Sequence, residues 1–293
     1  MTSNNFFQNS SEMSLLVQRY FDIDMRYKHA ENNNEIGRLR QQMTVVVTAR
    51  IGLCSPTLIA SLYSISKRQA LEHLNKLVKQ QLLICIITHR SVDGRIYICD
   101  SHGAKFAEEL MTIPVHFRRH TPAEKGVNQN TIMHDLMNAH ILLSLMQETS
   151  RKQPELNIYQ GLMTEREFKR QMTKADTRIV DGLLLEKSEG ANCIIALELE
   201  NSFKTKAQRS AILLRYLEAI KAGFYEKVFL ISQSKDILDD IKRFHSQLFD
   251  ELIEVRSSKT KQPLMSVSDV QLLKQAIVYR TKYCDELTEM FYR

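Results

Sequence analysis

The chain has 293 residues, 43% of them apolar and 25% charged, which is ordinary for a soluble globular protein long enough for two domains. Its formal charge of +6 permits a polyanionic partner, while scattered cysteines without CxxC pairs argue against disulfides and structural zinc. Because no apolar run approaches ~20 residues and the N-terminus lacks a secretory signal pattern, we expect a cytoplasmic protein without a membrane span.

Residues 1–41 form an N-terminal extension in which the segment from Met13 to Glu31 has the pattern of a helix. From 42 to 113 the pattern predicts a compact domain. Its first helix starts at Ser55-Pro56, where serine caps the helix and proline takes the first position. A second helix follows, in which Ser66 and Gln69 have capping-box spacing.

Two strands then follow, joined by the turn Ser91–Gly94, whose Asp-Gly pair is typical of a tight hairpin. A further helix over 103–111 completes the domain. Two helices joined by a short turn and followed by a hairpin predict a winged helix-turn-helix, whose second helix enters the major groove of DNA.

Basic and polar side chains lie where such a domain meets DNA, on the second helix and beside the hairpin tip. The predicted DNA-binding residues are Lys67, Arg68, Gln69, His73, Arg90 and Arg95. The alternative is a protein-interaction module whose basic side chains are merely solvated. Residues 114–130, with two prolines and a basic cluster, are predicted to be a linker.

Residues 131–293 alternate helix and strand and predict an α/β (α+β) domain of order α-β-β-β-α-β with additional C-terminal helices. In chain order its core elements are predicted as a capped amphipathic helix over 130–149, a strand over 156–163, a turn or brief helix over 164–172, a hairpin within 178–200, a helix over 205–224 and a strand over 226–232. The sequence does not decide whether the helices after Ser232 cover the sheet, form a homodimer surface or contact a partner.

The hairpin carries acids inside apolar strands: Asp181 in the first strand, and Glu198 and Glu200 in the second. Side chains two apart on a strand share a face, so both glutamates point the same way and Asp181 can oppose them. Converging carboxylates repel each other, and a divalent cation such as Mg²⁺ or Mn²⁺ relieves that repulsion. Lys204 is placed to neutralise charge that develops on a phosphorus atom. The pattern therefore indicates metal-assisted phosphodiester cleavage.

The same residues allow a second interpretation, in which the acids are paired individually with Lys174, Arg178 or Lys204 across the sheet. A D…ExE pattern arises often by chance, and spacing alone does not choose between a metal site and these ion pairs.

The order of short motifs resembles the PD-(D/E)XK nuclease superfamily, with its restriction-endonuclease-like fold, and more specifically the replication-relaxation group and the MobC-type plasmid relaxases. The matching pieces are HDLMNAHILLSL, TEREFKR, RIVDGLLL, ALELENS and LLRYLEA, within residues 42–232. Two positions depart from the superfamily pattern: Val180 replaces the usual proline, and Glu200 replaces the lysine of E-x-K.

This resemblance implies a plasmid mobilisation relaxase, a metal-dependent enzyme that binds an origin of transfer and nicks one strand, acting with accessory relaxosome and coupling proteins. It implies Asp181, Glu198 and Glu200 as metal ligands and catalytic residues. Because Glu200 replaces the usual lysine, the charge-stabilising role is left open, and Lys204, four residues further on, is the candidate catalytic residue for it. No His-hydrophobic-His triplet is present, since His134 and His140 are six residues apart. The alternative function is a non-catalytic winged-helix replication initiator or regulator.

Overall fold

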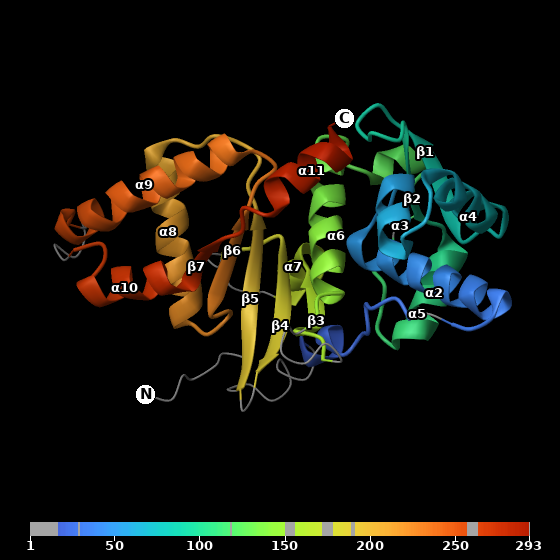
Figure 1. Cartoon of the computed structure of the whole chain (residues 1–293), viewed down its shortest axis with the longest axis horizontal. Helices are drawn as coiled ribbons and strands as arrows, with labels where there is room; N and C mark the ends of the chain where they lie inside the picture. The colour runs from blue at the N-terminus through green and yellow to red at the C-terminus, as the bar shows by residue number, and fades with distance from the viewer. Residues whose placement is uncertain are drawn as a thin grey trace.

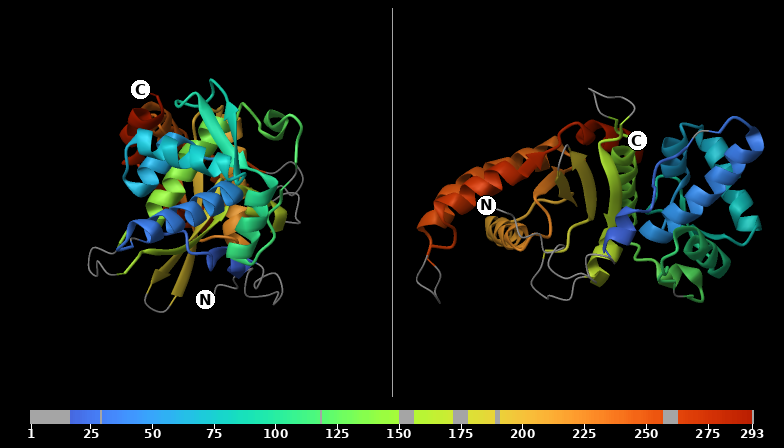
Figure 2. Two further views of the ribbon diagram at one scale, coloured as in Figure 1. Left: turned by 90° about the vertical axis from the view of Figure 1, so that its right-hand side faces the viewer. Right: turned by 90° about the horizontal axis from the view of Figure 1, so that it is seen from below.

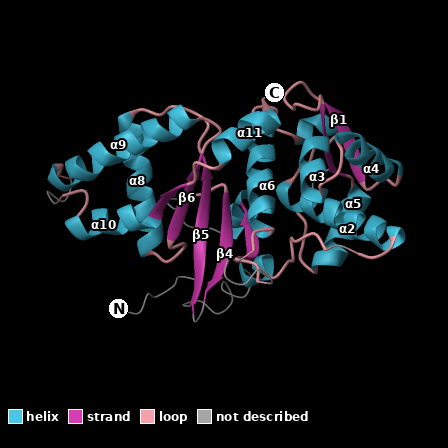
Figure 3. Ribbon diagram, viewed as in Figure 1, coloured by secondary structure: helices cyan, strands magenta, loops and turns pink. Residues whose placement is uncertain are grey.

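The computed structural model describes residues 17–28, 30–117, 119–149, 156–171, 178–188, 191–256 and 263–292. It is a mixed α/β structure with two sheets (Figures 1 and 3). Within the described ranges, no helix combines the length and the apolar character needed to cross a membrane.

The first part of the chain, here called the N-terminal unit, packs four helices against a two-stranded antiparallel hairpin. Its elements are α2 (Asn33–Ile51), α3 (Pro56–Tyr63), α4 (Lys67–Lys79), β1 (Leu83–Ile87), β2 (Arg95–Cys99) and α5 (Ser101–Met111). The predicted caps are confirmed: Ser55 accepts the Leu58 N–H, and Ser66 and Gln69 form a reciprocal capping box. Gly94 takes a positive φ of 66° in the hairpin loop.

The early helix predicted over 13–31 is largely wrong in its described part. Helical structure covers residues 17–21, and the described residues that follow, up to residue 30, are irregular. The next helix, α2, begins at Asn33, where Asn32 caps it, and ends at Gly52 with a φ of 101°. The described residues of the predicted linker, 114–117 and 119–130, are mostly irregular apart from the short 3-10 helix η2 (Ala123–Gly126).

The second part of the chain, here called the sheet unit, is built on a five-stranded sheet of order β3-β4-β5-β6-β7. Strands β3, β4 and β5 pair antiparallel, whereas β5, β6 and β7 are parallel. Its elements are α6 (Ile132–Met146), β3 (Tyr159–Thr164), α7 (Glu165–Gln171), β4 (Gly182–Ser188), β5 (Ala191–Leu199), α8 (Lys206–Lys221), β6 (Lys227–Ile231), α9 (Lys235–Glu254), α10 (Val267–Ala276), β7 (Ile277–Tyr279) and α11 (Tyr283–Phe291). The described elements follow the predicted α-β-β-β-α-β order, with α7 between the first two strands.

Helix α6 lies between the sheet and the N-terminal unit, while α8, α9 and α10 gather on the other side (Figures 1 and 2). It contacts α3, β3, β4 and α11. The sequence predicts a capped, amphipathic helix here, and this is wrong on both points. Thr131 makes no side-chain cap, and most positions of α6 are buried because partners surround it.

Arg50 and Glu167 join the two units through a buried ion pair between α2 and α7. The guanidinium Nε and Nη2 atoms donate to the two carboxylate oxygens at 2.8 Å each, and Nη2 also donates to the Leu162 and Tyr20 carbonyls. Both side chains are almost fully buried. The relative position of the two units therefore depends on a bidentate contact shielded from water.

Candidate functional site

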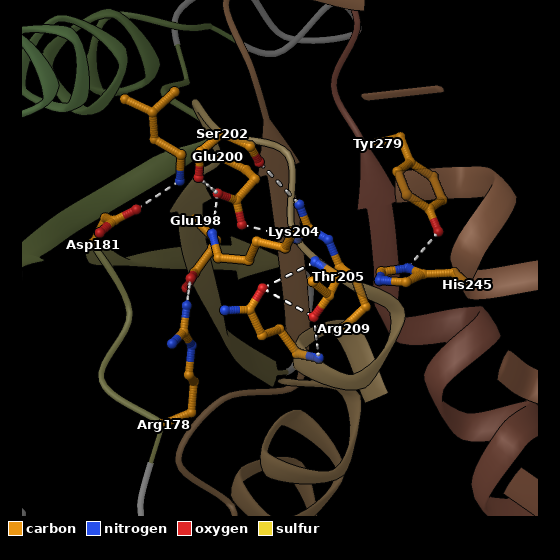
Figure 4. Close-up of polar contacts among 12 residues, drawn as sticks. Arg178, Asp181, Glu198, Glu200, Ser202, Lys204, Thr205, Arg209, His245 and Tyr279 are labelled. Carbon is orange, nitrogen blue, oxygen red and sulfur yellow. Dashed lines mark hydrogen bonds and ion pairs between the residues drawn. The ribbon is translucent and has the colours of Figure 1, made fainter. Parts of the chain in front are cut away.

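Asp181, Glu198 and Glu200, here called the carboxylate cluster, lie at one end of the central hairpin. Asp181 directly precedes β4, and Glu200 directly follows β5. The register pairs Gly182 with Leu197, so Asp181 and Glu198 come to the same end of the sheet. In Figure 4 the three carboxylates are directed to different partners. The sequence thus predicted their common location and two of the cations beside them, Arg178 and Lys204, and the structure adds Arg209.

Asp181 is held by the backbone of β5 and by a histidine of α6. Its Oδ2 atom accepts the Leu199 N–H at 2.6 Å, and His134 Nε2 lies 3.5 Å from the same oxygen. Asn138, one turn further along α6, donates to the Asp181 carbonyl at 2.8 Å. These contacts tie the start of β4 to α6.

Glu198 is 4% exposed and forms an ion pair with Arg178, which lies in the segment before β4. The pair uses Glu198 Oε1. The other oxygen, Oε2, is buried without a hydrogen-bond partner among the described residues. A buried carboxylate oxygen loses its hydration, and where no described residue donates a hydrogen bond in return, the burial costs free energy.

Glu200 is equally buried and is held by two cations. Lys204 and the Ser202 hydroxyl donate to Oε1, and Arg209 of α8 donates to Oε2 at 2.8 Å. Arg209 is 1% exposed, so both partners of this second contact are removed from water. Thr205 and Gln208 form a capping box at the start of α8, which fixes the helix that carries Arg209 (Figure 4).

These contacts decide how the acids are arranged with respect to a metal ion. Among the residues that the structure describes, no group of three or more Asp, Glu, His and Cys side chains is arranged to hold one. Arg178, Lys204 and Arg209 occupy oxygens that a cation would need, so this arrangement does not fit the expected Mg²⁺ or Mn²⁺ site. It matches the individual ion pairs of the second interpretation, with Lys174 outside the described residues.

His134 and Glu165 belong to the same region but were not among the predicted site residues. Burial alone would lower the pKa of His134, but hydrogen bonds and charge from Asp135 and Asp181 outweigh it and raise this pKa to about 10. Burial, together with the charges of Asp181 and Asp135, raises the pKa of the Glu165 carboxyl. His134 begins the motif piece HDLMN, and Glu165 lies in the motif piece TEREF. These two pieces were the sequence signals for the presence of both residues beside the carboxylate cluster.

The raised pKa of His134 makes stability depend on pH. The folded pKa of about 10 exceeds the ordinary 6.5. Protonated His134 therefore contributes fully to the free energy of unfolding below pH 6.5, and this contribution is lost as the pH rises toward 10. With allowance for partial exposure, we expect a loss of about 2–3 kcal/mol in the free energy of unfolding between pH 6 and pH 9.5. Urea unfolding at both pH values measures it. In His134→Gln this difference should shrink, and an unchanged difference would contradict the assignment.

A second set of predicted residues lies on α4 of the N-terminal unit, at the outer edge of the molecule in Figure 1. Its inner face buries Ala70, Leu74 and Leu77. Its other positions carry four basic side chains and one acidic one; the basic residues are Lys67, Arg68, Lys76 and Lys79. Arg68 is 89% exposed and Lys67 is 59% exposed. Helix α4 therefore presents a basic surface to solvent.

The hairpin loop is fixed against α3 and the start of α4. Asp93 accepts the Thr57 N–H at 2.9 Å and the Thr57 hydroxyl at 2.8 Å, and Lys67 Nζ lies 3.7 Å away. Arg90 is exposed and Arg95 half-buried at this hairpin. The hairpin loop and the start of α4 are thus held together through Asp93.

The other two predicted DNA-binding residues are engaged within the protein. Gln69 Oε1 accepts the Ser66 N–H as part of the capping box. His73 is half-buried, with Nε2 2.9 Å from the Thr44 hydroxyl. Burial, and then the charges of Arg40 and Lys76, lower its pKa to about 4, so it is neutral at pH 7. The exposed basic surface is therefore carried by lysine and arginine.

Residues 49–228 match the replication-relaxation family. This match spans both units and more than half of the chain, so the protein belongs to the replication-relaxation family. No curated protein and no solved structure shows significant similarity to it.

Proposed function

We propose that this protein binds duplex DNA and acts in plasmid replication or mobilisation. The observation that carries the proposal is the exposed basic surface of α4 beside a hairpin fixed at its tip. Membership of the replication-relaxation family supports the cellular role.

In this proposal the N-terminal unit acts as a winged helix-turn-helix. The amino-terminal part of α4 enters the major groove, and the hairpin meets the phosphate backbone. Lys67 and Arg68 stand at the start of α4, and Arg90 and Arg95 extend the contact at the hairpin. Because lysine and arginine dominate this surface, most of the affinity comes from phosphate contacts.

The double variant Lys67→Ala/Arg68→Ala tests the interface. Removal of two phosphate contacts should weaken binding to a plasmid-origin duplex roughly tenfold or more at 0.1 M salt, as measured by fluorescence anisotropy. Lys235→Ala is the matched control, because Lys235 is 60% exposed on α9, in the other unit. Equal affinity of the double variant and wild type would remove α4 from the interface.

A second proposed function is strand nicking at the carboxylate cluster. In this function the protein is a relaxase that uses Mg²⁺ or Mn²⁺ at a restriction-endonuclease-like sheet. One observation favours it: buried ionisable groups are concentrated at a single sheet end, where Glu198 Oε2 has no hydrogen-bond partner among the described residues. The ion pairs of Arg178, Lys204 and Arg209 do not leave a shared metal position, and no reaction step follows from this arrangement.

Nicking is tested on supercoiled origin-bearing plasmid with Mg²⁺ or Mn²⁺. This function predicts that wild type produces open circles, and that Asp181→Asn and Glu198→Gln lose the product while retaining duplex binding. Glu186→Gln is the control, since Glu186 pairs with Lys227 away from the cluster. Equal nicking by wild type and the cluster variants would show that these acids do not perform it, and linear product would indicate double-strand cleavage.

A further inference from the structure

A cavity of about 380 Å³ lies outside the carboxylate cluster and apart from α4. It is open to solvent on one side and is lined by the end of α2, the hairpin strands, the segment that follows α5, and Arg166 of α7. Its volume is within the range of sites for small ligands.

Basic side chains outnumber acidic ones in the lining of this cavity. Arg119, Arg166, His116 and His120 line it. Among the described lining residues, Asp100 is the single carboxylate, and it already accepts the Ser101 N–H as the cap of α5. No hydrogen bond or ion pair to the guanidinium of Arg119 or Arg166 is found among the described residues. An anionic ligand would complement these groups.

Two glycines make room for the side chains that line the cavity. A Cβ on Gly52 would lie 1.9 Å from Arg166 Nη1, and the φ of 101° at Gly52 also disfavours a larger residue. A Cβ on Gly126 would lie 2.8 Å from His120 Cδ2. Arg166 and His120 therefore each pack directly over a backbone that has no side chain.

The rest of the lining combines apolar side chains, among them Phe117, Ile84 and Ile98, with two threonines. Guanidinium groups bind phosphate oxygens in pairs, and an aromatic ring offers a face to a planar base. We propose that this cavity binds a nucleoside phosphate, with Arg119 and Arg166 at the phosphate groups and Phe117 beside the base. The proposal is independent of the DNA interface on α4.

Isothermal titration of the full chain with ADP, and separately with inorganic phosphate, tests the cavity. We expect ADP to bind more tightly than phosphate, and Arg119→Ala and Arg166→Ala each to raise its Kd by about tenfold or more. Lys169→Ala is the matched control, since Lys169 is exposed on the same helix as Arg166 but does not line the cavity. Thermal unfolding of each variant identifies those that lose the fold.

Absence of ADP binding at millimolar concentration would overturn the proposal, as would equal affinities in wild type and both arginine variants. Equal affinity for ADP and phosphate would show that the cavity binds only an anion, and would overturn the proposed contact with a base.

The variants are also titrated with duplex DNA. If Arg119→Ala and Arg166→Ala weaken duplex binding as much as ADP binding, the cavity belongs to the DNA interface and the nucleoside phosphate is rejected. Unchanged ADP binding in Lys67→Ala/Arg68→Ala supports independent sites.

Discussion

Replacement of Arg50 by alanine is expected to lower the free energy of unfolding by about 3–5 kcal/mol, because it leaves the buried Glu167 carboxylate without its partner. Arg50 also donates to two backbone carbonyls, from Tyr20 and Leu162, so one substitution removes contacts to three segments. Urea unfolding at pH 7, followed by circular dichroism, measures the change.

The exposed pair Arg68–Glu72 provides the control, since both side chains are mostly in water. Arg68→Ala should change stability by less than about 1 kcal/mol. The double variant Arg50→Met/Glu167→Leu should recover much of the loss, because it removes both charges together. A loss in Arg50→Ala no larger than that in Arg68→Ala would show that the joint between the units rests on other contacts.

Arg209→Ala is expected to have the second largest effect, a loss of about 3 kcal/mol, because Glu200 would retain a buried oxygen without a counter-charge. Arg209 is 1% exposed, and its guanidinium lies 2.8 Å from Glu200 Oε2. Nearby His245 cannot replace it, because burial, the larger of the two causes that lower the pKa of His245 to about 3 in the wild type, remains when Arg209 is removed. Chemical denaturation again gives the value.

Lys204→Ala is the comparison for Arg209→Ala, because Lys204 pairs with the other oxygen of Glu200 but its side chain is 27% exposed. Its loss should cost clearly less, since water can reach the vacated position. A Lys204→Ala variant that is less stable than Arg209→Ala would contradict the view that Arg209 is the main support of Glu200.

Local chemistry made much of the fold predictable. Ser55-Pro56, the Ser66/Gln69 capping box and the Asp93-Gly94 turn each satisfy backbone groups through their own side chains or conformations, so their effects depend little on distant residues. The central hairpin was likewise predictable, because its two largely apolar strands, Gly182–Ser188 and Ala191–Leu199, follow each other closely in the sequence.

Elements governed by distant packing were harder to predict. Helix α2 begins with a polar stretch and ends in a β-branched run, VVVTARI, that is typical of a strand, yet its buried C-terminal half is helical where it packs against α5 and β2. Strand β7 was missed because Ile277–Tyr279 is only three residues long and follows α10 directly. Its pairing with β6 depends on tertiary structure.

The carboxylate cluster shows where sequence reasoning stops. Strand periodicity placed Asp181, Glu198 and Glu200 at one sheet end, but the same pattern allowed either a shared cation or individual ion pairs. Arg178 and Lys204 were foreseen as partners, whereas Arg209 was not. An arginine in line with Ile212, Leu213 and Tyr216 on the buried face of α8 was the available signal, since a charge in that position requires a buried partner.

The central claim is that α4 and the hairpin bind DNA through its phosphate groups. The dependence of duplex affinity on salt concentration tests this claim most directly. The logarithm of the association constant should fall steeply and linearly with the logarithm of salt concentration. In Lys67→Ala/Arg68→Ala the slope should be shallower by about 2, since each phosphate contact contributes about 0.9. A flat response in wild type, or an identical slope in the double variant, would contradict the account.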